Sequence, residues 1–280
     1  MRRGLPSRIG FWSRMLRQPA AVVGAVIILV LIAVALGADL IAPYDPFATS
    51  TDALQAPSAA HLFGTDDLGR DVFSGVLHGA RVSLLVGVVS ATTATLLGVL
   101  VGGVAGYVGG LVDDVLMRLT EVFMVVPRFF LALVVVSLLG GSIWLIVLVL
   151  GMTMWPGTAR LLRSQVLSLR SRDYAMAART IGASEPRILV RHILPGALPP
   201  VITLAALQVG GAILIEAGLS FLGLGDRNLM SWGIILNDAQ QFMRQAWWIS
   251  AFPGLAIMLT VLALNLLADG LNEARDPRLS

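Results

Sequence analysis

The chain has 280 residues, of which 56% are hydrophobic and only 13% are charged, and its mean hydropathy is +0.83. An ordinary soluble domain carries about 25% charged residues, so this chain has too few charges to cover a surface exposed to water. The composition excludes a soluble globular protein and predicts an all-α polytopic membrane protein.

The basic residues narrow the possible chemistry further. All 20 are arginine, the net charge is +3, and the chain has no lysine and no cysteine. A chain without lysine has neither a phosphate-binding GxxxxGK[ST] loop nor Schiff-base chemistry. A chain without cysteine has no disulfides, thiolate metal sites or thiol nucleophiles. In a membrane protein, excess arginine marks cytoplasmic loops more often than nucleic-acid binding, so no nucleic-acid partner is expected.

Charge-free runs predict six membrane-spanning helices, because one span needs about 20 apolar residues. The first run is too long for the apolar part of a cleaved signal peptide. The run between Phe129 and Ala159 is divided by the turn signal Gly140-Gly141-Ser142, so the helix before that turn must begin near Met117. The predicted spans are 20–40, 82–107, 117–139, 143–162, 198–218 and 247–268.

The distribution of arginine predicts the orientation. With the N-terminus in the cytoplasm, 15 of the 20 arginines lie in cytoplasmic segments, four lie outside and Arg128 falls within a span. This bias follows the positive-inside rule and places both termini in the cytoplasm. We expect residues 1–81 to hold a cytoplasmic tail, the first span and an outer loop. Residues 82–280 should form a five-helix core with a cytoplasmic loop at about 160–195.

Four glycines recur at a spacing of four residues: Gly98, Gly102, Gly106 and Gly110. This spacing places them on one face of a helix, where the absence of side chains lets another helix approach closely. Tight packing within the bundle is the simpler interpretation, and a surface that slides during transport is the other.

The cytoplasmic segment between the fourth and fifth spans holds seven arginines and predicts two short helices. One covers Tyr174–Ile181 after Asp173 and stops at Gly182, and the other begins after Ser184 and ends at Pro195-Gly196. Ala175 and Ala178, with Gly182 beyond them, predict a low-profile surface on the first helix that could enter a groove on another protein. A basic loop that only enforces topology is the alternative, and anchoring in lipid at both flanks argues against a DNA-binding helix–turn–helix.

This segment resembles the EAA loop of permeases in binding-protein-dependent ABC importers. The resemblance rests on Tyr174, Ala175, Ala177, Ala178, Gly182, Leu194 and Pro195, with Met176 where the family has glutamate. Three further stretches resemble the second, C-type permease of dipeptide, oligopeptide and nickel importers. They are HLFGTDDLGRDV at 61–72, EAGLSFLGLG at 216–225 and DPR at 276–278.

The resemblance covers essentially the whole chain and implies an importer permease with a five-helix core plus one N-terminal helix. It implies three kinds of partner: a homologous permease that completes the pore, two cytoplasmic ATPase subunits or domains that bind ATP and magnesium, and an extracytoplasmic solute-binding protein. It also implies a bacterial inner-membrane location and a peptide-like solute, with nickel chelates and glutathione as alternatives. The chain itself is expected to carry no cofactor, metal or catalytic residue, since its three histidines lack ligand spacing.

Polar residues inside or near the predicted spans form the last candidate group. Charges within a membrane are costly and face a partner, the bundle interior or a water path. These residues could therefore pair within the bundle or line a translocation path, and a self-sufficient secondary transporter using Glu121 and Glu216 is the rival function. The group is Glu121, Arg128, Gln208, Glu216 and Asn265.

Overall fold

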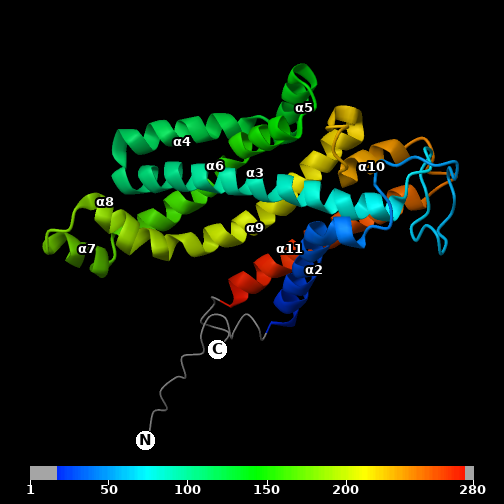
Figure 1. Cartoon of the computed structure of the whole chain (residues 1–280). Helices are drawn as coiled ribbons and strands as arrows, with labels where there is room; N and C mark the ends of the chain where they lie inside the picture. The colour runs from blue at the N-terminus through cyan, green and yellow to red at the C-terminus, as the bar shows by residue number, and fades with distance from the viewer. Residues whose placement is uncertain (1–17, 275–280) are drawn as a thin grey trace, which may run out of the picture.

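The computed structural model describes residues 18–274, and these residues fold almost entirely into helices (Figure 1). Within them there is no β-strand, only one isolated bridge between Thr65 and Asp71. The helices of the first half are α2 (Pro19–Ile41), α3 (Val72–Val108), α4 (Gly110–Val125), α5 (Arg128–Leu139) and α6 (Ile143–Arg170). The second half contains α7 (Asp173–Thr180), α8 (Glu185–Ile188), the π-helical turn η1 (Leu189–Ile193), α9 (Leu194–Leu219), the π-helical turn η2 (Ser220–Leu224), α10 (Trp232–Ala239) and α11 (Trp248–Glu273).

The number of spans agrees with the sequence prediction once a broken helix is counted. Five helical segments are long and apolar enough to cross a membrane: α2, α3, α6, the continuous run from α8 to η2, and α11. The pair α4 and α5 meets the same criterion together, and counting this bent pair as one span gives six. The predicted all-α fold with six spans is therefore confirmed.

The third span is not the single straight helix predicted for residues 117–139. It begins earlier, at Gly110, and bends by 76° between α4 and α5. Pro127 explains the break, because proline has no N–H to donate and disfavours helical backbone in the residue before it. Val126 accordingly has extended backbone, with φ −82° and ψ 123°. The prediction of one unbroken helix was wrong.

Several helices are longer than their apolar runs. Asp71 caps α3 by accepting a hydrogen bond from the Ser74 amide, so this helix begins at Val72 and not near residue 82. Its 37 residues measure about 55 Å, nearly twice the hydrocarbon thickness of a bilayer. The expected boundary after residue 81 falls inside this continuous helix, and the division of the chain there stays a prediction.

The chain also continues in helical form where a stop was expected at Pro195-Gly196. Helix α8 passes through η1 directly into α9, and Pro195 lies in the first turn of α9. Proline has no N–H to donate, and the π-helical turn directly before it, in which the Leu194 amide bonds to the Leu189 carbonyl, accommodates it within the continuous helix. The predicted end of the second cytoplasmic helix was therefore wrong.

The core forms where α3 packs along α6. A Cβ atom built on Gly98, Gly102 or Gly106 would collide with Thr158, Ala159 or Arg163 of α6, so these three glycines allow close helix contact as predicted. Gly110 does not share that face. It follows Gly109 in the turn into α4, has φ +56° and has nothing within 4 Å of a built Cβ, so its prediction as a packing glycine was wrong.

The long helices give the molecule two distinct ends (Figure 1). One end carries residues 42–71 and α10, and we call it the α10 end. The opposite end carries α7 and α8, and we call it the α7 end. Chain segments between successive long helices alternate between these ends, as expected of a protein that crosses a membrane repeatedly.

Candidate functional site

The short helix α7 packs part of its small-residue face against the rest of the chain. Ala175 is completely buried and Ala178 is 5% exposed, and both belong to a core cluster with Ile188 and residues of α6 and α9. The expected docking surface of Ala175 and Ala178 is therefore wrong. Their small side chains let α7 approach its own bundle.

The opposite side of α7 is available to a partner. Tyr174 is 45% exposed, Ile181 is 85% exposed, and Ala177 is also exposed. Gly182 ends the helix with φ +81°, a left-handed conformation that favours glycine. Leu194 is half-buried against the same core cluster, and Pro195 is exposed. The segment thus leaves Tyr174, Ala177 and Ile181 exposed at the α7 end.

A polar contact joins this segment to the end of α3. The Tyr107 hydroxyl donates to the Glu185 carboxylate, and Arg179 of α7 lies 3.4 Å from Glu185. The Arg179 guanidinium also lies 5.9 Å from the centre of the Tyr107 ring. Contacts with Tyr107 and then Glu185 raise the pKa of the Arg179 guanidinium, so this residue stays charged. These contacts join α7 and α8 to α3, a helix that runs to the opposite end of the molecule (Figure 1).

Two of the polar residues predicted within spans are paired inside the bundle. The Gln208 amide donates to the Met154 carbonyl and the Thr158 hydroxyl, both at 3.1 Å. Glu216 is completely buried, and its Oε1 accepts hydrogen bonds from Ser220 at 2.7 Å and Ser231 at 2.8 Å. These contacts tie α9 to α6, to η2 and to the start of α10. They support structural pairing for both residues.

The other three polar candidates are exposed. Glu121 lies 3.5 Å from Arg118 on its own helix, whereas Arg128 begins α5 beyond the 76° bend. The structure does not pair Glu121 with Arg128, because Pro127 redirects the chain between them. Asn265 lies on an exposed face of α11. The structure thus does not bring the five predicted polar residues into one site.

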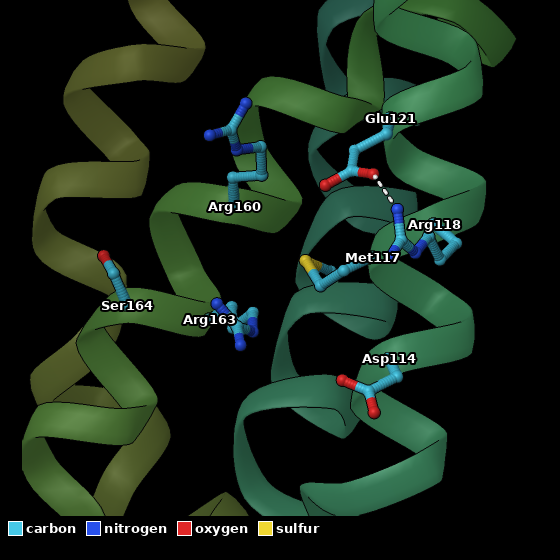
Figure 2. A pocket seen from close by; sticks show the side chains of 7 residues that line it. All are labelled: Asp114, Met117, Arg118, Glu121, Arg160, Arg163 and Ser164. Atoms are coloured by element: carbon cyan, nitrogen blue, oxygen red, sulfur yellow. Dashed lines mark hydrogen bonds and ion pairs between the residues drawn. The ribbon is translucent and has the colours of Figure 1, made fainter.

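A charged groove between α4 and α6 was not predicted from the sequence as a unit. It has a volume of about 630 Å³ and is open along one side of the molecule. Figure 2 shows Glu121 of α4 and Arg160 of α6 on opposite walls, with Arg118 beside Glu121. Seven residues line it: Asp114, Met117, Arg118, Glu121, Arg160, Arg163 and Ser164.

Two contacts join α4 to α6 beside this groove. At one end, Arg163 binds Asp113 through two hydrogen bonds of 2.5 and 2.6 Å. At the other end, Arg160 lies 3.4 Å from the sulfur of Met124. Glu121 was a sequence candidate, but the arginines across the groove were missed because their proximity depends on how α4 packs on α6.

A second polar network lies at the α10 end. Arg70 binds Asp66 at 2.5 Å and Asp238 of α10 at 2.8 Å, and all three side chains are mostly buried. Burial opposes the charged form of Arg70, but the Asp66 and Asp238 carboxylates outweigh it and raise the pKa of its guanidinium. The Trp248 indole also donates to the Thr65 carbonyl at 3.1 Å. Residues 42–71 are therefore fixed onto α10 and α11.

The described residues 18–274 contain no group of three or more His, Cys, Asp or Glu side chains arranged to hold a metal ion. The described residues do contain a His–Asp pair, His61 and Asp71, whose side chains lie 2.9 Å apart. Asp71 also caps α3 through Ser74, so this pair stabilises the start of a helix.

Comparison with known proteins matches two family models to the chain. The model described as "Binding-protein-dependent transport system inner membrane component" matches residues 95–280. The model described as "N-terminal TM domain of oligopeptide transport permease C" matches residues 9–57. Together they cover most of the segments that carried the resemblance.

Curated relatives align along nearly the whole chain. The dipeptide transport system permease protein DppC of Escherichia coli is 45% identical over 277 residues, covering 96% of this chain and 92% of the relative. The glutathione transport system permease protein GsiD of Pectobacterium atrosepticum is 41% identical, covering 96% and 90%. DppC of Bacillus subtilis is 40% identical, covering 96% and 85%.

The predicted resemblance to a C-type permease is thus confirmed by similarity along the chain and by a helical bundle with six spans. The α7 segment lies in the region matched by the larger family model. The chain belongs to the family of binding-protein-dependent transport system inner membrane components.

Proposed function

We propose that this chain forms half of a membrane pore through which an ATP-driven importer moves short peptides into the cytoplasm. Relatives named as dipeptide permeases and a glutathione permease support this solute class. Glutathione is itself a peptide with free carboxylates, so the solutes named for these relatives belong to one chemical class. The single observation that carries the proposal is the similarity to dipeptide permeases over 96% of the chain.

A homologous permease completes the pore in this proposal. Helix α4 supports it because its two exposed faces differ in polarity. Leu111, Val115 and Val122 are 65–82% exposed and follow one another along one face, whereas Asp114 and Glu121 line the groove. An apolar face suits lipid or a second membrane protein, and a charged face at membrane depth requires water or a polar partner.

The exposed surface of α7 is the proposed contact for the ATPase subunits, which bind ATP and magnesium. The absence of lysine rules out a phosphate-binding loop of the GxxxxGK[ST] type in this chain, so we propose that it is not itself an enzyme. The link between Arg179, Glu185 and Tyr107 would pass movement of the ATPases to α3. An extracytoplasmic solute-binding protein would deliver the peptide to the α10 end.

A charge placed on α7 tests this arrangement. Ala177→Arg adds an unpaired charge to the exposed face and should abolish ATPase association and peptide uptake, while the chain still inserts and pairs with the second permease. Asn272→Arg is a matched control, because it adds the same charge to an exposed position near the end of α11. Uptake that persists in the Ala177→Arg variant, or in cells that lack the ATPases, would contradict the proposal and favour a self-sufficient transporter.

Ala178→Arg tests whether Ala178 supports the fold of this chain or contacts a partner protein. Ala178 is buried against its own chain, so an arginine there should destabilise the α7 end by several kcal/mol, on the order of the cost of an unpaired buried charge. Lower levels of the folded chain should accompany the loss of uptake. Normal folding with only ATPase association lost would show that Ala178 faces the partner.

Cysteine labelling tests the proposed orientation in this cysteine-free chain. Ser58→Cys and Gln241→Cys are exposed at the α10 end, and Ser171→Cys is exposed beside α7. A reagent that cannot cross membranes should label the first two in intact cells and should label position 171 only after the membrane is opened. Labelling of position 171 in intact cells would show that the chain has the opposite orientation to the one proposed.

A further inference from the structure

Among the charged side chains of the α4–α6 groove, Arg160 stands out by its lack of an anionic partner. Arg163 is bound by Asp113 through two hydrogen bonds, and Arg118 lies 3.5 Å from Glu121. In the part of the chain that the structure describes, Arg160 makes no ion pair, and its guanidinium contacts only the Met124 sulfur at 3.4 Å. A thioether is a weak hydrogen-bond acceptor, so the guanidinium of Arg160 remains free to bind a carboxylate.

The depth of Arg160 in the membrane indicates that its unpaired charge needs a partner. Arg160 is the eighteenth residue of α6, which begins at Ile143, so it lies about 26 Å along the helix, at the proposed cytoplasmic edge of the apolar layer. A charge at that depth needs water or a polar partner. Figure 2 shows the Arg160 side chain on α6, across the groove from Glu121 of α4.

The groove also has the size and charge distribution that a short peptide requires. Its volume of about 630 Å³ lies within the range of small-molecule sites. The α6 wall offers the Arg160 guanidinium beside the Asp113-bound Arg163. The α4 wall offers the carboxylates of Asp114 and Glu121, with Arg118 3.5 Å from Glu121. A peptide carries a carboxylate at one terminus and an ammonium at the other, so the two walls match its two ends.

We propose that the α4–α6 groove is a water-filled vestibule of the solute path and that Arg160 binds the C-terminal carboxylate of the peptide there. A guanidinium is suited to this role because it can donate two parallel hydrogen bonds to one carboxylate. The inference rests on the proposed function, since it names a contact for the solute of that same pore. The Asp113–Arg163 pair fixes the start of α4 to α6 and keeps the vestibule in shape.

Thiol labelling tests whether the groove holds water in the complete transporter. Ser164→Cys is a conservative change on the groove wall, and Val115→Cys on the outer face of α4 is the control. In inside-out vesicles that carry all subunits, a reagent that cannot cross membranes should label position 164 at least about tenfold faster, because thiolate forms readily only in water. Equal labelling rates at the two positions, or no labelling at position 164, would show that the groove is not a water-filled vestibule.

Protection of that cysteine tests the role of Arg160. Millimolar alanyl-alanine added to the vesicles should slow labelling of Ser164→Cys, whereas alanyl-alanine amide, which lacks the carboxylate, should not. Adding Arg160→Gln to the Ser164→Cys chain should weaken protection by the free acid about tenfold, which corresponds to the loss of one charge-assisted contact. Arg160→Lys should restore part of it, because the positive charge returns.

The outcomes separate this inference from the proposed function. Uptake that depends on ATP and on the binding protein tests the importer by itself. Equal protection by the acid and the amide, or undiminished protection in the Arg160→Gln chain, would overturn the carboxylate contact while the importer stands.

Discussion

Arg70 at the α10 end is paired with two carboxylates of the same chain, whereas the charged side chains of the α4–α6 groove are left partly open. Arg70 is 15% exposed and lies between two carboxylates, but Arg118 and Glu121 are 84% and 60% exposed and Arg160 has only a thioether beside it. Ion pairs that are mostly buried fix geometry, and exposed ones contribute little. Residues 42–71 and α10, joined by the Arg70 network, therefore form a rigid unit that we call the cap. The charged side chains of the groove remain available for contacts with other molecules.

The largest expected effect comes from breaking the rigid cap. Arg70→Leu leaves Asp66 and Asp238 mostly buried without their cation, and loss of one partner from a buried pair costs about 3–5 kcal/mol. Thermal unfolding of the detergent-solubilised chain should show a clear loss of stability. Arg227→Leu is the control, because Arg227 is 67% exposed and 3.5 Å from Asp238, and it should cost less than about 1 kcal/mol. Equal effects of the two changes would mean that the cap does not depend on Arg70.

A smaller effect is expected where α3 packs on α6, between the cap and the α7 end. A Cβ on Gly102 would collide with the backbone of Ala159, whereas a Cβ on Gly103 would lie at an ordinary 3.7 Å from Leu162. Gly102→Ala should therefore destabilise the bundle by about 1–3 kcal/mol through overpacking. Gly103→Ala should be neutral or slightly stabilising, because alanine favours a helix over glycine.

The same unfolding measurement compares this pair of neighbouring glycines. Similar losses in both variants would show that α3 and α6 are not in contact along the Gly98, Gly102 and Gly106 face. Loss in the Gly102 variant alone would show that α3 packs closely on α6 at Gly102.

The sequence predicted those features that depend on local composition. Apolar runs indicated the number of spans, and the spacing of Gly98, Gly102 and Gly106 indicated a packing face that the structure confirms. The break before Arg128 could also have been found, since Pro127 is a strong signal for a helix end. The charge-free run began only at Phe129, and the span was extended back through Pro127 because a membrane helix needs about 20 residues. Length alone does not distinguish a straight span from a bent one.

Features that depend on long-range packing could not be predicted in this way. Arg70 and Asp238 are 168 residues apart in the chain, and no local pattern indicates that they meet. Ala175 and Ala178 show the same limit on a smaller scale. Small residues on one face indicate a close contact, but the sequence does not say whether the neighbour is a partner protein or the chain's own core.

The smallest expected effect tests whether the α7 end transmits movement. Tyr107→Phe removes the hydroxyl that donates to Glu185 and leaves the ring under Arg179 in place. An exposed hydrogen bond contributes about 0.5–1.5 kcal/mol, so stability should hardly change. If the contact couples α7 and α8 to α3, peptide uptake per ATP hydrolysed should still fall about two- to threefold, which matches the lower part of that range.

A second tyrosine at the other end of the molecule provides the comparison for this change. The Tyr44 hydroxyl donates to the Ala60 carbonyl at 3.3 Å within residues 42–71, so Tyr44→Phe removes a bond of the same kind from the cap. It should leave the ratio of uptake to ATP hydrolysis unchanged, because no moving subunit is proposed to act through that bond. A similar fall in both variants would mean that the ratio responds to general loosening of the chain, and Tyr107 would then have no special part in joining the two ends.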